Sequence, residues 1–192
     1  IEHQAKRLGN KPYILWGDEK ISFEEFDRAT CRAANGLAAF GAVEGDGLAI
    51  LMGNCPEFLL MLYGMPRAGF YTVPINVSLK GEGLGYILTH SDVKYLAVDD
   101  LLFRKVEELG RPLGAIQKIF VRRTEDKPVA HGTEDLAHLL GASSEKPGYT
   151  IQEGDMAFLL YTSGTTGFPK GVVNRNRSGM VDWYRYIVSL MI

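Results

Sequence analysis

The sequence is organised around the stretch Tyr161-Thr162-Ser163-Gly164-Thr165-Thr166-Gly167-Phe168-Pro169-Lys170-Gly171. An apolar run over residues 156–161 leads into it and predicts a buried strand. The following ten positions hold four hydroxyl residues, three glycines and one lysine. Glycine lets the backbone adopt positive φ and approach a ligand closely, while hydroxyls, backbone N–H groups and an ammonium supply donors and charge. These are the components of a site that holds a polyphosphate.

Three simpler interpretations of this loop compete with polyphosphate binding. A glycine-rich turn whose hydroxyls bond only to local backbone would not need so long a string. A Walker A loop would require Gly-Lys-Ser/Thr where Pro169-Lys170-Gly171 stands. A dinucleotide fingerprint would require a Gly-x-Gly opening, which Gly164 and Gly167 do not form. We therefore expect a phosphate-binding loop of another class, with these binding residues: Thr162, Ser163, Gly164, Thr165, Thr166, Gly167 and Lys170.

Composition limits the remaining possibilities. The 192 residues are 46% hydrophobic and 23% charged, which is enough apolar material for one sizeable core. A net charge of −2 argues against nucleic acid as the partner. No apolar run is long enough for a transmembrane segment, and no secretory leader opens the chain, so we expect a cytoplasmic protein. Cys31 and Cys55 are expected to be reduced thiols, and the scattered histidines predict no metal site.

Strand and helix patterns alternate along the chain. This alternation predicts an α/β fold with a doubly wound, mainly parallel sheet flanked by helices. The expected strands are residues 13–16 and 20–21, which form a hairpin, then 48–52, 71–75, 95–98, 116–121, 156–161 and 171–173. The expected helices lie within residues 1–11, 23–40, 56–66, 84–90, 101–109, 134–140 and 179–191.

Local signals set several element ends. Ser22 with Glu25 three residues later predicts a capping box, and Gly41 is placed to close the helix that follows. Pro66 should kink or end its helix, and Pro74 should lie at a strand end or on an edge strand. Residues 122–150 break the alternation, and we interpret them as a surface excursion with one short helical piece rather than a domain boundary.

The loop resembles a known signature. Residues 162–171 are similar to the phosphate-binding motif of the adenylate-forming superfamily, which includes acyl-CoA synthetases, peptide-synthetase adenylation domains and luciferases. Residues 21–26, 54–58 and 67–76 resemble other conserved segments of that superfamily at a matching spacing. The sequence of residues 75–81 resembles that of fatty-acyl and carnitine-type CoA ligases more than that of peptide-synthetase domains.

The resemblance implies an activity in two half-reactions. A carboxylic acid, of the fatty-acid class, would react with Mg²⁺-ATP to give an acyl-adenylate and pyrophosphate, and CoA would then displace AMP. The phosphate-binding residues would hold the β- and γ-phosphates, with Lys170 offsetting their charge. Residues 1–192 would be the N-terminal part of the AMP-binding domain, without the C-terminal domain. No catalytic residue is assignable within them, and we expect these residues alone to be inactive.

Two departures from the family pattern stand out. Arg175 and Asn176 stand where the family commonly has a Thr-His or Ser-His pair. The chain also stops within an expected helix whose apolar stripe needs a cover; the candidates are the chain's own sheet, in part, and a second copy in a homodimer. Two other functions stay open: an adenylation domain that loads a carrier protein, and a non-catalytic nucleotide-binding pseudo-enzyme.

Overall fold

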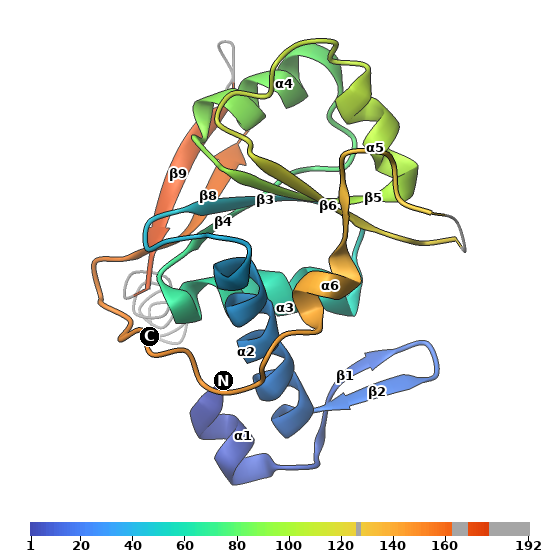
Figure 1. The fold of residues 1–192 in the computed structure, drawn as a ribbon. Helices are drawn as coiled ribbons and strands as arrows, with labels where there is room; N and C mark the ends of the chain where they lie inside the picture. The colour runs from blue at the N-terminus through green and yellow to red at the C-terminus, as the bar shows by residue number, and fades with distance from the viewer. Residues whose placement is uncertain (126–127, 163–168, 177–192) are drawn as a thin grey trace, which may run out of the picture.

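The structure is a computed structural model that describes residues 1–125, 128–162 and 169–176. Its centre is a sheet that has seven strands in this part of the chain, in the order β7-β6-β5-β3-β4-β8-β9. Every neighbouring pair is parallel except β8 and β9, which form an antiparallel hairpin (Figure 1). The strands of this sheet are β3 Gly47–Leu51, β4 Tyr71–Pro74, β5 Tyr95–Asp99, β6 Lys118–Arg122, β7 Glu134–Asp135, β8 Met156–Thr162 and β9 Lys170–Arg175.

Helices cover both faces of the sheet. Figure 1 shows α2, α3 and α6 on one side and α4 and α5 on the other, which confirms the predicted doubly wound, mainly parallel architecture. The helices are α1 Glu2–Leu8, α2 Phe23–Ala39, α3 Pro56–Gly64, the 3₁₀ helix η1 Met65–Ala68, α4 Gly81–His90, α5 Asp100–Glu107 and α6 Leu136–Leu140.

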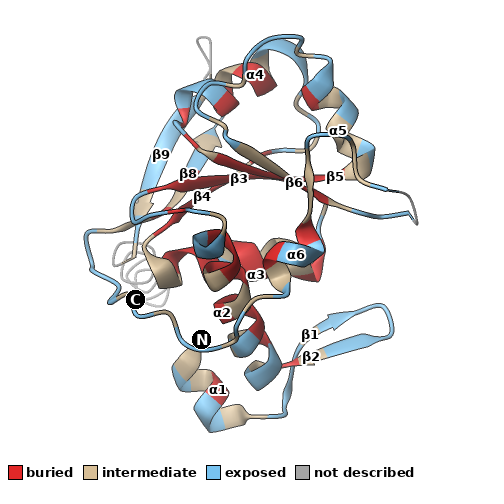
Figure 2. Ribbon diagram, in the orientation of Figure 1, coloured by how far each residue is buried: buried red, intermediate tan, exposed pale blue. Residues whose placement is uncertain are grey.

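Each face of the sheet has its own apolar core, because successive residues of a strand point to opposite sides. Figure 2 shows the buried residues concentrated on the strands and on the helix faces turned toward them. The core under α2, α3 and α6 includes Ala33, Leu37, Leu48, Ile50, Met61, Tyr95, Phe120, Leu136 and Leu139. The core under α4 and α5 includes Ala49, Leu51, Val73, Leu84, Ile87, Leu88, Leu96, Val98 and Val121.

A separate two-stranded hairpin precedes α2. Its strands, β1 Pro12–Trp16 and β2 Glu19–Ser22, pair as the sequence predicts. The capping box at the start of α2 is also present: Glu25 N donates to Ser22 Oγ at 3.2 Å, and Ser22 N donates to Glu25 Oε2 at 2.8 Å. Gly41 follows the helix with φ of 96°, a conformation that favours glycine.

Pro66 and Pro74 lie at element ends, as predicted from the sequence. Pro66 ends α3 and converts the chain to the 3₁₀ helix η1. Pro74 is the last residue of β4, although β4 lies between β3 and β8 in the interior of the sheet. The pairing with β3 continues past this proline, because Ile75 N donates to Ile50 O at 2.9 Å, so the missing N–H of Pro74 does not interrupt it.

The segment 122–150 is more than the surface excursion that we expected. It adds the edge strand β7 to the sheet and places Leu136 and Leu139 of α6 in the core, with 1% and 0% of their surface exposed. The contact of α6 with α2 is close: a Cβ on Gly36 would lie 1.9 Å from the carbonyl oxygen of Leu139. A strand of two residues and a helix of five are too short to give a periodic signal.

Candidate phosphate-binding site

The predicted phosphate-binding loop follows β8 and precedes β9, and the structure describes its two ends. Thr162, the last residue of β8, pairs in register with Lys170, the first residue of β9. Pairing across an antiparallel ladder brings their backbones side by side. The structure therefore brings together the two ends of the predicted site, while Ser163, Gly164, Thr165, Thr166 and Gly167 lie outside the described residues.

The hairpin lies at the carboxyl edge of the parallel strands. β8 runs parallel to β4, with Thr72 opposite Phe158, so Thr162 is at the same edge as the ends of β3, β4, β5 and β6. Ligands of open α/β sheets bind at this edge, where loops and helix amino ends meet. The position of the loop is therefore the one that this class of sheet uses for binding.

The described ends of the loop are suited to an anion. Thr162 and Lys170 are both exposed, and Lys170 makes no ion pair with any described residue. A hydroxyl donor next to an uncommitted ammonium provides hydrogen bonds and charge for a phosphate oxygen. Among the described residues, no carboxylate pairs with Lys170.

Arg175 and Asn176 occupy the base of the same hairpin. The Arg175 guanidinium donates to the carbonyl of Gly154. Asn176 donates from its backbone N to Asp155 O at 3.1 Å and from Nδ2 to Gln152 O at 3.4 Å. These two residues therefore fasten the end of β9 to the segment that leads into β8.

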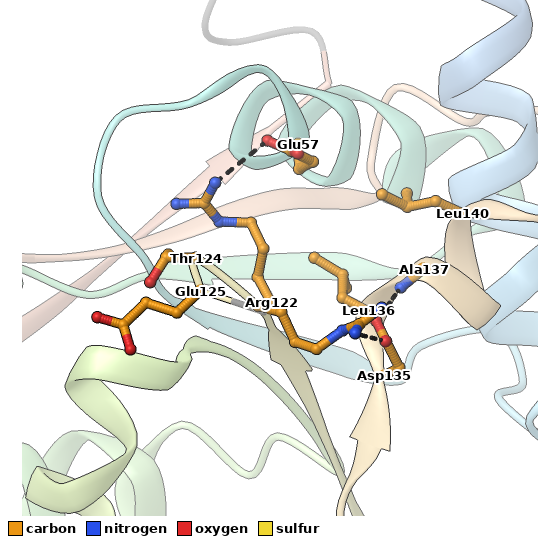
Figure 3. Close-up of a pocket in the computed structure, with 9 residues that line it drawn as sticks. Glu57, Arg122, Thr124, Glu125, Asp135, Leu136, Ala137 and Leu140 are labelled. Carbon is orange, nitrogen blue, oxygen red and sulfur yellow. Dashed lines mark hydrogen bonds and ion pairs between the residues drawn. The ribbon is translucent and has the colours of Figure 1, made fainter. Parts of the chain in front are cut away.

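A second set of polar side chains lines a cavity of about 330 Å³ (Figure 3). This cavity lies beside β6 and β7, at the other end of the strand order from β8 and β9. Arg122 Nε donates to Asp99 Oδ1 at 2.8 Å, and Arg122 Nη1 lies 3.7 Å from Glu57 Oε2. Arg123 pairs with Asp135 at 2.7 Å. Each arginine of the cavity thus has an acidic partner, and these ion pairs join α3, β5, β6 and β7 at one place.

Asp99 also joins the end of β5 to the segment that follows β3. The chain leaves β3 toward β4 and leaves β5 toward β6, so the strand order reverses between them. Asp99 Oδ2 accepts a hydrogen bond from Gly53 N at 2.8 Å across this reversal. No motif in the sequence predicted this network, although the charged pairs Asp99-Asp100 and Arg122-Arg123 directly follow two predicted strands and are a signal of it.

The nearby thiol is not a nucleophile. Cys55 precedes α3 and is buried, and burial raises the pKa of its thiol to about 11. A thiol with such a pKa is protonated at neutral pH and unreactive.

Within the described ranges, no group of three or more His, Cys, Asp or Glu side chains is arranged to hold a metal ion. Of the helices that the structure describes, none has both the length and the apolar character required to cross a bilayer.

Comparison with known proteins shows that the sequence is similar to those of several CoA ligases. It is 30% identical over 190 residues to a 4-hydroxybutyrate–CoA ligase of Metallosphaera sedula, a match that covers 95% of this chain and 34% of that protein. It is 30% identical over 178 residues to a 3-hydroxybenzoate/4-hydroxybenzoate–CoA ligase of Thauera aromatica, covering 92% and 34%. The chain therefore spans about a third of the length of the curated relatives it matches.

Solved structures agree on the fold. The anthranilate CoA ligase AuaEII, solved with anthranoyl-AMP, superposes with a TM-score of 0.84 at 22% identity over 92% of this chain and 34% of that one. The N-terminal domain of FACL13 from Mycobacterium tuberculosis superposes with a TM-score of 0.79 at 26% identity, over 92% and 43%.

The family comparison covers nearly the whole chain. The sequence profile described as "AMP-binding enzyme" matches residues 1–186, which include all described strands and the complete phosphate-binding loop. The chain belongs to the family of AMP-binding enzymes.

Proposed function

We propose that residues 1–192 are the N-terminal part of the AMP-binding domain of an ATP-dependent acyl-CoA synthetase, an acid–thiol ligase. Family membership supports this, as do relatives whose names describe CoA ligases for 4-hydroxybutyrate, hydroxybenzoates and fatty acids. Because the chain spans about a third of those relatives, the activity is proposed for the full-length protein.

The proposed substrate is a carboxylic acid, and within that class a fatty acid. The sequence of residues 75–81 supports a fatty-acyl or carnitine-type ligase. Relatives named as medium/long-chain-fatty-acid and crotonobetaine/carnitine CoA ligases are 28% and 32% identical to the chain.

The buried free thiols of Cys31 and Cys55 support a reducing, cytoplasmic location.

The reaction divides into two displacements. In the first, a carboxylate oxygen attacks the α-phosphorus of ATP and the bond to pyrophosphate breaks, which leaves an acyl-adenylate. In the second, the sulfur of CoA attacks the acyl carbon and the bond to AMP breaks, so the thiol proton goes to solvent or to a base. Positioning and neutralisation of the departing pyrophosphate dominate the first step.

The loop is the part of this chain that we assign to that step. Thr162, Ser163, Thr165, Thr166 and the backbone N–H groups of Gly164 and Gly167 would donate to the β- and γ-phosphate oxygens. Lys170 would offset their charge, and ATP would arrive with Mg²⁺ as its counterion. Each hydrogen bond to a charged oxygen contributes roughly 1.5–3 kcal/mol.

The observation that carries the assignment is the register pair at the base of the loop. Thr162 and Lys170 lie opposite each other, exposed, at the carboxyl edge of the sheet. Two exposed residues with hydrogen-bond donors, side by side at this edge of the sheet, support an anion as the ligand of the loop.

The test is an assay of the purified full-length protein with ATP, Mg²⁺ and a panel of fatty, aromatic, hydroxy and amino acids, with and without CoA. Acid-dependent pyrophosphate release, followed by AMP and acyl-CoA when CoA is added, is the expected result. Pyrophosphate release with an amino acid, and acyl transfer only to a carrier protein, would favour the carrier-loading alternative. ATP binding without pyrophosphate release for any acid would favour a pseudo-enzyme.

Residues 1–192 alone are expected to give no turnover, because the residues assigned here bind phosphates only. Weak ATP binding without acyl-CoA formation is the expected result in the same assay. CoA-dependent AMP formation by these residues alone would show that the remaining two thirds of the relatives' length are not needed.

A further inference from the structure

Three rings from two elements meet at the residue that precedes Thr162. Tyr86 and His90, one turn apart on α4, stack at 4.9 Å between ring centroids with planes 26° apart. Tyr161 of β8 meets both edge-on, at 6.5 Å from Tyr86 and 5.9 Å from His90. The Tyr161 hydroxyl lies 2.7 Å from His90 Nδ1. The last turn of α4 is thus bonded to the residue that precedes Thr162.

The phenol of Tyr161 keeps its proton in this contact. Burial raises the pKa of Tyr161 to about 12, with smaller contributions from Tyr86, Tyr71 and Asp92. The phenol is therefore protonated at neutral pH, and its O–H group can share this hydrogen bond with Nδ1 as donor or as acceptor.

The other side of Tyr161 is fixed by β9. Tyr161 pairs in register with Gly171, and a Cβ on Gly171 would lie 3.5 Å from Cζ of Tyr161 and 3.1 Å from Cδ1 of Leu159. The ring of Tyr161 thus lies over a strand position that has no side chain. It is held between α4 and the strand that carries Lys170.

This placement affects the loop through strand geometry. Successive side chains of a strand point to opposite faces, so the orientation of Tyr161 determines the direction in which Thr162 points. The next pair in the ladder is Thr162 with Lys170, which are the two described members of the phosphate-binding set. A displacement of about 1 Å in groups that orient a reacting phosphate can cost about a hundredfold in rate.

We propose that His90 and Tyr86 are positioning residues that act through Tyr161 to hold the two ends of the phosphate-binding loop for adenylate formation. This inference rests on the proposed function of the loop. Neither His90 nor Tyr86 belongs to the loop motif, and neither is expected to contact ATP. The simpler alternative is that the three rings only fasten α4 to the sheet.

Four variants of the full-length protein separate these alternatives. Tyr161→Phe and His90→Phe each remove the hydrogen bond and keep an aromatic ring. His90→Asn keeps an amide that can donate or accept near the Nδ1 position and should restore part of the loss. Tyr71→Phe is the matched control, because the Tyr71 hydroxyl donates to Ser91 O at 2.7 Å and so joins the same end of α4 to the neighbouring strand β4, away from the loop.

The main measurement compares the two half-reactions. Tyr161→Phe and His90→Phe should slow adenylate formation about three- to tenfold, the range expected for one lost hydrogen bond, and should leave thiolysis of preformed acyl-adenylate unchanged. The double variant Tyr161→Phe/His90→Phe should be no slower than either single variant, because both remove one interaction. Equal slowing of both half-reactions, or a loss equal to that of Tyr71→Phe, would overturn the positioning role.

A second measurement needs no reaction and so remains informative if the proposed function fails. Hydrogen exchange of the backbone amides in residues 157–162 and 170–175 should be faster in Tyr161→Phe and His90→Phe than in Tyr71→Phe. If the wild-type protein forms no adenylate with any acid, the proposed function is wrong, and exchange alone decides whether these rings order the hairpin. Unchanged exchange in both variants would show that they do not.

Discussion

Thr162 and Lys170 form the last register pair of the β8–β9 hairpin before the phosphate-binding loop begins. This pair joins two residues that the sequence separates by the whole loop. It places a hydroxyl residue and a lysine on adjacent backbones at the carboxyl edge of a mainly parallel sheet, which is the arrangement that the proposed phosphate site requires.

Removal of the Lys170 charge should slow the first half-reaction selectively. Lys170→Ala in the full-length protein should slow adenylate formation by about tenfold or more, since 1.4 kcal/mol is a factor of ten. Thr165→Val should act in the same direction. Thiolysis of preformed acyl-adenylate should change much less, because pyrophosphate has already departed. Single-turnover kinetics of each half-reaction provide the measurement.

Lys20→Ala is the matched control for this comparison, because Lys20 is an exposed lysine in a strand of the other hairpin. It should leave both half-reactions at wild-type rates. The assignment of Lys170 would be wrong if Lys170→Ala slowed both half-reactions equally or neither.

The contact between α2 and α6 should make one glycine irreplaceable. Gly36→Ala places a Cβ 1.9 Å from the backbone carbonyl oxygen of Leu139, so the two helices must separate. Overpacking of this kind costs about 1–3 kcal/mol, more than the roughly 1 kcal/mol that alanine gains over glycine in a helix. Gly83→Ala in α4 meets only an ordinary contact at 3.5 Å and should be neutral or stabilising. Urea unfolding should give a lower free energy of unfolding for Gly36→Ala than for the wild-type protein and for Gly83→Ala, and a Gly36→Ala protein of wild-type stability would contradict the packing described.

Loss of the Asp99 carboxylate should destabilise the carboxyl edge of the sheet. Asp99→Ala leaves the Arg122 guanidinium and Gly53 N without their main acceptor. We expect a loss of about 3 kcal/mol, at the low end for a broken buried pair, because Arg122 keeps 23% of its side-chain surface exposed. Asp99→Asn, which can still accept from Gly53, should lose less. Equal free energies of unfolding for the two variants would show that the Gly53 bond contributes nothing.

Two tyrosines with raised pKa values should make the free energy of unfolding fall at alkaline pH. Burial raises the pKa of Tyr71 and Tyr161 from the ordinary value of 10.0 to about 12. The unfolded chain therefore loses these protons first, so the stability that they contribute is complete below pH 10 and is lost as the pH rises from 10 to 12. Urea unfolding at a series of alkaline pH values should show a falling free energy of unfolding. The fall should be shallower in Tyr71→Phe/Tyr161→Phe, and an unchanged slope would disprove the burial of these phenols.

The sequence by itself determined the features that depend on neighbouring residues. Hydrophobic periodicity predicted the main helices and strands, the Ser22 side chain three residues before Glu25 predicted the capping box, and Pro66 predicted the end of α3. The string from Thr162 to Gly171 also predicted the family, which the match over residues 1–186 shows. These features share one cause: each is encoded within a few residues, or in an unbroken motif, and needs no distant partner.

Only the tertiary structure decided which distant residues meet. Strand order brought Asp99, Arg122 and Gly53 together at the carboxyl edge, and packing turned part of segment 122–150 into an edge strand and a core helix. It also brought His90, at the end of α4, to Tyr161, 71 positions later. No local pattern predicts such contacts, because a strand's neighbours and a helix's face are selected by the burial of the whole apolar surface, which is a property of the complete fold.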